Sequence, residues 1–292
     1  MGGITVALMS KHCLRWRSLA RSSFQFPFMN LYTRDVEGLR RIFQSAFSVL
    51  DVAEPLLSFD AVTPIARIRK AMDSAEVDVV GIRKGGTVCG YAERGKLADA
   101  EALELEEFQN GQIITDNTSL VDVVVRLKDQ PYVFVSVLGN LSGIVGRNEI
   151  QKPAGRMWLF GMVTLIEMRF GLLIERYCGD GRWQEFVSEG RLEKAKEIQA
   201  ERQRRNLTVK LLDCLQLSDK LQIVARNPEL RKRTRFESRK KMEQAIKAVE
   251  KLRNNLAHSQ DLVSNDWDLI VALAENFEGV IAGPPGLREE PV

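Results

Sequence analysis

The first half of the chain alternates short apolar runs with amphipathic helical patterns. Residues 35–50 place apolar side chains three and four positions apart, which predicts a helix leading into the first domain. Beyond it, the pattern predicts a strand, a helix and a hairpin whose turn holds Gly85 and Gly86, and then a further short helix. These elements are expected at residues 56–59, from Thr63-Pro64 to Met72, at 77–82, at 87–91 and at 93–97.

The same order of elements recurs about 55 residues later. Each half alone would expose one face of a small sheet, so the duplication predicts two repeats that cover each other. The acidic stretch between them, residues 99–107, is expected to be a solvated helix face that acts as a connector. The second set of elements is expected at residues 113–114, 120–127, 132–138 and 141–145, with a helical turn from Arg147 onward.

Strand patterns end at Pro153, and long helical patterns occupy the rest of the chain. The predicted fold is therefore α+β: tandem repeats with small mixed sheets and helices, followed by an all-α helical bundle. The longest apolar segment, residues 157–174, contains Glu167 and Arg169. A membrane-spanning helix needs roughly 20 predominantly apolar residues, so we expect a buried core helix and no membrane contact.

The two ends of the chain differ in composition from the rest. Residues 1–29 contain Lys and Arg but no acidic residue, which is typical of a transit peptide, yet we prefer a disordered extension or a misassigned start with Met29 as the first residue. A Gly-Pro-Pro-Gly sequence at 283–286 precedes the C-terminus. The predicted regions are the extension at 1–29, the N-terminal helix and repeats at 30–152, the bundle at 153–280 and a flexible tail at 281–292.

The amino-acid composition excludes several kinds of functional site. The net charge of +3 does not by itself indicate a polyanionic partner. The four cysteines form no Cys-x-x-Cys pair and the only histidines are His12 and His258, so no zinc or disulfide framework is expected and a cytoplasmic location is the simplest setting. We find neither a P-loop nor a Ser-His-Asp arrangement in the sequence.

Each repeat ends in a recognisable sequence. Residues 90–97 are Gly-Tyr-Ala-Glu-Arg-Gly-Lys-Leu, and residues 143–150 are Gly-Ile-Val-Gly-Arg-Asn-Glu-Ile. The duplicated unit resembles the tandem cystathionine-beta-synthase (CBS) domain, or Bateman module, whose repeats end in Gly-Ile-Val-Thr-x-x-Asp-Leu. In its nucleotide-binding members, the Thr position contacts phosphate and the Asp position holds the ribose hydroxyls.

The chain departs from that pattern at both positions. The first repeat has Glu93 and Lys96 there, which implies a degenerate pocket. The second repeat has Gly146 and Glu149, so the resemblance implies an adenine-nucleotide site in which Glu149 holds the ribose and Arg147 lies near a phosphate. The alternative is that the repeats serve as a dimerisation platform, with Arg147 and Glu149 forming an exposed ion pair.

The most basic stretch and a second motif lie in the helical half. Residues 226–241 contain eight Lys or Arg against two Glu, which indicates either an RNA-positioning surface or a solvated helix face. A strong amphipathic helix follows and ends in Leu252-Arg-Asn-Asn-Leu-Ala-His258. This ending resembles the Arg-x4-6-His motif of the HEPN superfamily, helical domains that include metal-independent ribonucleases acting as dimers.

The spacing of the motif has a geometric consequence. His258 lies five positions after Arg253, so their side chains lie about 140° apart on a straight helix. Either the helix bends or frays near His258, or the two groups meet opposite copies across the two-fold axis of a homodimer. The alternative is a purely structural role, in which Arg253 neutralises helix C-terminal carbonyls and His258 is a capping residue.

The residue types suit RNA cleavage. His258 is the candidate general acid or base, and Arg253 the candidate clamp for the phosphate. Asn254 or Asn255 would orient the imidazole or the phosphate. The sequence thus predicts a CBS-regulated homodimer that binds or cleaves RNA and needs no cofactor, with an adenine nucleotide as regulatory ligand. The alternatives are a non-enzymatic, adenine-nucleotide-sensing regulator that acts through a protein partner, and a helical half that serves only for oligomerisation.

Overall fold

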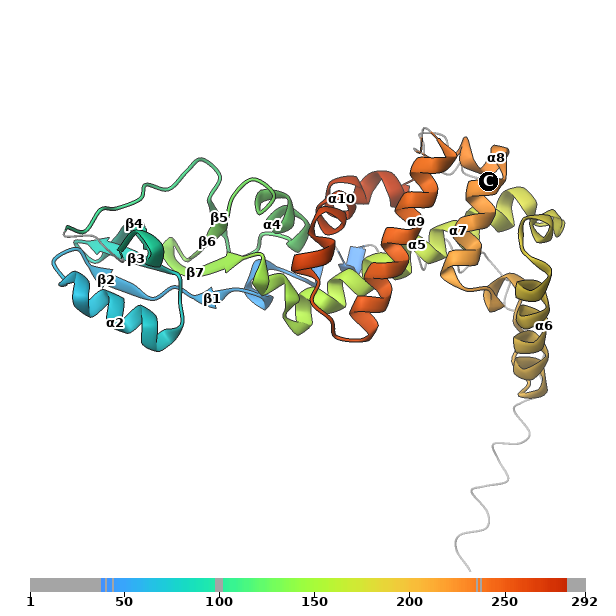
Figure 1. Cartoon of the computed structure of the whole chain (residues 1–292), viewed down its shortest axis with the longest axis horizontal. Coiled ribbons are helices and arrows are strands. Elements are labelled where there is room, and N and C mark those ends of the chain that lie inside the picture. Colours follow the sequence, from blue (N-terminus) through green and yellow to red (C-terminus); the bar gives the residue numbers. More distant parts are fainter. Residues whose placement is uncertain are drawn as a thin grey trace, which may run out of the picture.

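The chain is a mixed α/β protein with two small sheets at one end and helices at the other (Figure 1). The computed structural model describes residues 38–282 apart from residues 40, 44, 98–101, 235 and 237. The predicted extension at 1–29 and residues 283–292 of the predicted tail lie outside the described part. The predicted mixture of small sheets and helices is confirmed.

The two predicted repeats are present, each with the order strand, helix, hairpin and helical turn. The first sheet has the strand order β2-β3-β4, and the second has the order β1-β7-β6-β5. The first repeat consists of β2 (Ser58–Asp60), α2 (Ile65–Ala75), β3 (Val79–Lys84), β4 (Thr87–Glu93) and α3 (Arg94–Leu97). The second consists of β5 (Ile113–Thr115), α4 (Leu120–Arg126), β6 (Tyr132–Val137), β7 (Asn140–Gly146) and the 3-10 helix η2 (Asn148–Gln151).

The duplication extends to the register of the hairpins. The pairs of β3 and β4 recur in β6 and β7 with a constant offset: Val79 pairs with Glu93, and 53 residues further on Tyr132 pairs with Gly146. The irregularity between Ile82 and Arg83 recurs at the equivalent place in β6. A shared bulge position indicates two copies of one structural unit, because bulges are specific local features of a strand pair.

The segment before each repeat also pairs with the sheet of the other repeat. The short strand β1 (Glu54–Pro55) precedes the first repeat but pairs with β7 of the second, where Glu54 lies opposite Ile144. Glu106 precedes the second repeat and forms a bridge with Tyr91 of β4, with N–H···O distances of 3.1 and 2.8 Å. Tyr91 and Ile144 are equivalent positions, so the exchange is reciprocal. Neither sheet is complete without the other repeat.

The predicted helical connector between the repeats is wrong for the part that the structure describes. Residues 102–110 are not helical, and they run along the edge of β4. Leu103 and Leu105 pack against the core of the first repeat, while Glu104 between them is exposed. This alternation has the period of a strand, and the open edge of β4 offers backbone partners that a solvated helix would leave unpaired.

Helices make up the regular structure of the second half. The long helix α5 (Pro153–Cys178) forms its axis, and α7, α9 and α10 pack against it. The other elements are the 3-10 helices η3 (Arg182–Phe186) and η4 (Leu211–Cys214) and the helices α6 (Glu189–Arg204), α7 (Leu217–Arg226), α8 (Pro228–Arg231), α9 (Arg239–Ala257) and α10 (Val263–Ala282). The division of the chain into domains at residue 153 stays a prediction.

One hydrophobic core joins the second repeat to the helices. The cluster includes Val133 and Val145 from the second sheet, Trp158 and Leu165 from α5, and Ile270 from α10. The first repeat has a smaller core of its own, and a third cluster fills the space between the sheets. Among the described residues, α5 is the one helix long and apolar enough to cross a membrane, but 56% of that window is buried, as is usual for a core helix.

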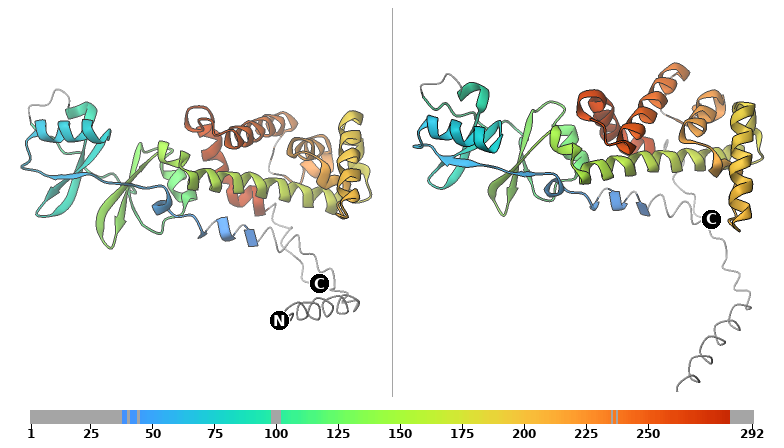
Figure 2. Two further views of the ribbon diagram at one scale, coloured as in Figure 1. Left: turned by 90° about the horizontal axis from the view of Figure 1, so that it is seen from below. Right: turned by 60° about the horizontal axis from the view of Figure 1, so that its bottom comes forward.

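The segment before β1 follows the side of α5 that faces away from α7 and α9 (Figure 2). The predicted helix at 35–50 ends early, because the helical residues stop at Ser45 and a separate 3-10 helix η1 (Val49–Asp51) follows. The ring of Phe43 lies on Gly161 of α5, and a β-carbon at Gly161 would overlap that ring. The contact therefore requires a glycine.

Gly161→Ala should destabilise the protein by about 1–3 kcal/mol, because the added methyl group overpacks the contact with Phe43. Gly171→Ala is the matched control on the same helix, since its β-carbon would meet no atom within 4 Å. It should be neutral or stabilising by up to about 1 kcal/mol. Urea unfolding of both variants measures the difference, and equal free energies of unfolding would contradict the proposed packing. In a Phe43→Ala background, the cost of Gly161→Ala should largely disappear.

Candidate functional site

The Arg-His motif lies where α9 ends and the chain turns into α10. The hydroxyl group of Ser238 caps the start of α9 by accepting a hydrogen bond from the backbone N–H of Lys241 at 3.2 Å. His258 follows the last helical residue, and its backbone N–H donates to the carbonyl of Asn254 at 3.0 Å. Ser259 then has a positive φ of 54°, which breaks the helix directly after His258.

The three predicted catalytic residues are exposed to solvent. Arg253, Asn254 and His258 lie on the surface, and the guanidinium group of Arg253 donates to the side chain of Asn254 at 3.4 Å. Within the described residues, no hydrogen bond or ion pair joins the side chains of Arg253 and His258. The structure brings Arg253 to Asn254 but does not bring Arg253 to His258 within one protomer, in keeping with their separation of about 140° around a helix.

Asn255 has a different role from Asn254. Its side chain is buried, with 8% exposed, and donates a hydrogen bond to the carboxylate of Asp266 in α10. Asp266 is itself only 5% exposed and forms an ion pair with Lys251 at 3.2 Å. A buried carboxylate is stable only with partners of this kind. Asp266 thus fixes the end of α9 against α10, a role that the sequence analysis missed.

The turn after His258 is also tied to the start of α5. The guanidinium group of Arg156 donates to the carbonyl of Gln260 at 3.0 and 2.6 Å, and the side chain of Gln151 accepts from the backbone N–H of Leu262 at 3.0 Å. Hydrogen bonds from the side chain and backbone of Ser264 lower the pKa of Asp261 below its ordinary value. The motif therefore lies on a fixed turn at the junction with the second repeat.

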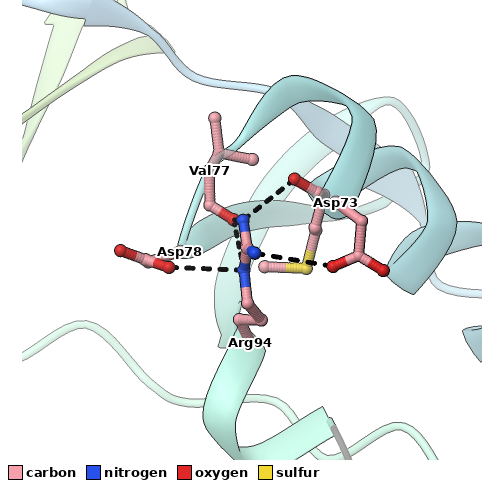
Figure 3. Close-up of polar contacts among 5 residues, drawn as sticks. Asp73, Val77, Asp78 and Arg94 are labelled. Atoms are coloured by element: carbon pink, nitrogen blue, oxygen red, sulfur yellow. Dashed lines mark hydrogen bonds and ion pairs between the residues drawn. The ribbon is translucent and has the colours of Figure 1, made fainter.

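The two repeats use an equivalent arginine in the same way. Arg94 of the first repeat donates to the carbonyls of Met72 and Val77 at the end of α2, and forms ion pairs with Asp73 and Asp78 (Figure 3). This arrangement suits a cation, because carbonyl groups at a helix C-terminus carry partial negative charge.

Arg147 is the second member of this pair and one of the two predicted nucleotide ligands. It donates to the carbonyls of Leu127 and Lys128 after α4, both at 3.1 Å. Its guanidinium group also lies over the ring of Trp267 in α10, 5.0 Å from the centroid. Nearby, Lys128 and Glu275 form an ion pair at 2.6 Å. Both contacts join the second repeat to α10, and Trp267 directly follows Asp266.

Glu149, the other predicted ligand, accepts a hydrogen bond from the backbone N–H of Gly146 at 2.6 Å. It thus caps the turn after β7, and within the described residues it forms no ion pair with Arg147. In the first repeat, Lys96 occupies the same position and pairs with Glu106 at 2.8 Å. The hydrogen bond to Glu106 raises the pKa of the Lys96 ammonium group. Both motif positions already make contacts within the chain.

Aromatic side chains fill the space between the two sheets. The ring centroids of Tyr91, Phe108 and Phe134 lie 4.9 to 5.7 Å apart. Tyr132 packs against this cluster, and burial raises the pKa of its phenol group. The packing of these rings holds the repeats together, because aromatic pairs at such distances stabilise beyond the area that they bury.

Comparisons with known proteins give limited similarity. A scan against protein-family models finds no match, and a search of curated proteins finds no similar sequence. Solved structures similar to part of the chain include a hemolysin-like CBS-domain protein of Oenococcus oeni PSU, which is 14% identical with a TM-score of 0.32 over 40% of this chain and 96% of that one. The CBS domain of a bacterial CNNM/CorC family Mg2+ transporter in complex with ATP is 11% identical, with a TM-score of 0.32 over 42% and 97%.

Asn255→Ala should lower the free energy of unfolding by about 1–3 kcal/mol, because it leaves the buried Asp266 carboxylate without one of its hydrogen-bond donors. Asn254→Ala removes the neighbouring, exposed amide and should change stability by less than about 0.5 kcal/mol. Denaturant unfolding of the two variants measures the contrast. An equal loss from both variants would show that the Asn255 contact does not hold the helix end.

Proposed function

We propose that the chain is a homodimeric, CBS-type regulatory protein whose helical half binds and cleaves RNA at the end of α9. The observation that carries this proposal is the exposed pair of Arg253 and His258 on a turn that buried contacts hold in place. Reactive groups that face solvent on a fixed support are what a site for a large substrate needs. The assignment of the repeats to the CBS type rests on their ending sequences and on the duplicated register.

The proposed chemistry needs no metal ion. The 2′-hydroxyl oxygen attacks the adjacent phosphorus, and the bond to the 5′ oxygen of the next nucleotide breaks, which leaves a 2′,3′-cyclic phosphate and a 5′-hydroxyl end. A neutral His258 accepts the 2′-hydroxyl proton, and a protonated His258 donates a proton to the leaving oxygen. Arg253 stabilises the negative charge on the pentacoordinate phosphate, and the amide of Asn254 keeps the guanidinium group in place.

A homodimer is proposed because one protomer leaves the site incomplete. Arg253 and His258 do not meet within the chain, yet both side chains are open to solvent and accessible to a second copy. A two-fold axis near the end of α9 would place two imidazoles and two guanidinium groups in one cleft. One imidazole would then serve as base and the other as acid.

Regulation is proposed to enter through the second repeat. Arg147 contacts both the end of α4 and Trp267, and Trp267 directly follows Asp266, the residue that holds Asn255. An adenine nucleotide bound at the second repeat would compete for the guanidinium group of Arg147 through its phosphate. Such competition would loosen α10 and with it the turn that carries His258.

The basic stretch lies at the other end of α9 from the motif. His258 lies nineteen positions after Arg239, which corresponds to about 28 Å along a helix. Several of its cations already have partners: Lys232 pairs with Glu229, and Arg233 lies 3.7 Å from the centroid of the Tyr177 ring. The stretch would therefore contact RNA at a distance from the bond that is cleaved.

The enzymatic proposal is tested with purified protein and mixed RNA in EDTA. The wild-type chain should produce fragments with 2′,3′-cyclic ends, and His258→Ala should slow cleavage by about 100-fold or more, because general acid–base groups typically contribute 10²–10⁴-fold. Cyclic ends are identified by a block to polymerase extension that alkaline phosphatase alone does not remove, but that acid opening of the ring followed by phosphatase does. Gln260→Ala, two residues further on in the same turn, is the control for local disturbance.

Equal inactivity of the wild type and His258→Ala would refute cleavage. It would favour the alternative of a non-enzymatic regulator that senses an adenine nucleotide and acts through a protein partner. Cleavage that persists in His258→Ala at the wild-type rate would assign the activity to other residues or to a contaminant.

The proposed coupling predicts that ATP changes hydrogen exchange in residues 251–266. Trp267→Leu should abolish this change and should bind ATP as tightly as the wild type or more tightly, because the ring no longer competes with ATP for Arg147. Trp183→Leu removes another buried tryptophan at a distance and should keep the response. Hydrogen exchange with mass spectrometry gives the readout, and a full response in Trp267→Leu would exclude this route.

A further inference from the structure

Helices α6, α7 and α9 surround a cavity of about 320 Å³ in the helical half. Small-molecule sites begin at about 300 Å³, so the cavity is large enough for one compact ligand. Its walls are mainly polar and include Ser188, Arg191, Ser218, Arg226 and Glu250. These side chains do not belong to the Arg-His motif or to the repeats.

Some of the polar groups on the walls have no partner in the part of the chain that the structure describes. Ser218 is only 6% exposed, and its hydroxyl group makes no hydrogen bond. The half-buried carboxylate of Glu250 has neither an ion pair nor a hydrogen bond. Both polar groups line the cavity and are open to it, so both are available to pair with a bound ligand.

The cations of the cavity are only partly engaged. Arg226 donates to the carbonyl of Phe186 through one nitrogen at 3.0 Å. Arg191 donates to the side chain of Gln216 at 2.9 Å and pairs with Asp219 at 3.7 Å, so Arg226 is the freer of the two cations. The first turn of α6 begins at the cavity wall, and the hydroxyl group of its N-cap residue Ser188 makes no capping hydrogen bond. Free amides at the start of a 16-residue helix, next to a guanidinium group, favour an anion such as phosphate.

Glu250 restricts the kind of molecule that can carry this phosphate into the cavity. Its carboxylate would repel a bare phosphate ion, but it accepts hydrogen bonds from hydroxyl groups. A ligand that satisfies both sides carries a phosphate and a hydroxyl donor a few ångströms apart. We propose that the cavity binds a ribonucleotide unit, with its phosphate against Arg226 and the start of α6 and its 2′-hydroxyl donating to Glu250.

The position of the cavity connects it to the motif. Glu250 precedes His258 by eight residues on α9, which is about 12 Å along the helix, and Arg226 is the first residue of the basic stretch. The cavity therefore lies between the basic stretch and the exposed end of α9. The ligand is either a free mononucleotide or one nucleotide of a bound RNA strand, and only the second source rests on the proposed function.

The test measures binding of uridine monophosphate and its 2′-deoxy analogue to the full chain by calorimetry. Uridine avoids the adenine site proposed for the repeats. The wild type should bind the ribonucleotide about tenfold tighter, which corresponds to one hydrogen bond to a charged group. Glu250→Gln should lose most of this preference, and Ser218→Ala should weaken both ligands. Glu243→Gln is the matched control, because Glu243 also lies on α9 but pairs with Arg239.

All measurements are repeated in the His258→Ala background, so they do not depend on RNA cleavage. A ribonucleotide preference that persists there supports the cavity whether or not the wild type cleaves RNA, and an inactive wild type with this preference refutes the nuclease alone. Tighter binding of a uridine trinucleotide than of the monophosphate identifies an RNA strand as the source, and equal binding identifies the free nucleotide. The inference is overturned if uridine monophosphate does not bind, or if Glu250→Gln and Glu243→Gln have the same affinities for the two ligands.

Discussion

The structure depends on the burial of α5 between the second repeat and the other helices. Its side chains belong to the same hydrophobic cluster as Val133 and Val145 of the second sheet and Ile270 of α10. Such a core cannot form in parts, because removing either side would expose large apolar area to water. The sheet of the second repeat and the helix that carries the motif therefore share one packing unit, while the first repeat keeps a separate core.

The fixed turn at the end of α9 separates buried structural residues from exposed residues in one short sequence. Asn255 points inward to Asp266, whereas Arg253, Asn254 and His258 remain at the surface. A buried amide bound to a buried carboxylate has one orientation, since each alternative leaves a polar group unpaired. The side chains of the exposed residues can thus move while the backbone that carries them stays fixed. This division supports the assignment of chemistry to the exposed members.

The sequence predicted the repeats well because their signals are local. Period-two runs and the glycines of the hairpin turn are sufficient to place β3, β4, β6 and β7. The reciprocal strand exchange was missed because it pairs segments that are far apart, although the alternation of Leu103 and Leu105 was a signal for a strand. The motif residues were found by their order in the chain, but their partners Asp266 and Arg156 lie on other helices, and no spacing rule connects them. The cavity could not be predicted from the sequence either, because its walls come from three separate helices.

The two equivalent arginines show how duplication gave the repeats different roles. Arg94 and Arg147 bind the carbonyls at the ends of α2 and α4, so both inherited the same contact. Arg94 completes its shell with Asp73 and Asp78, carboxylates of its own repeat, whereas Arg147 lies on an aromatic ring of α10. A guanidinium group neutralised by local carboxylates has no reason to move a distant helix. Arg147, which forms no ion pair among the described residues, instead contacts Trp267 of α10 directly. This contact joins the second repeat to the helix that follows the motif, and the proposed regulation depends on it.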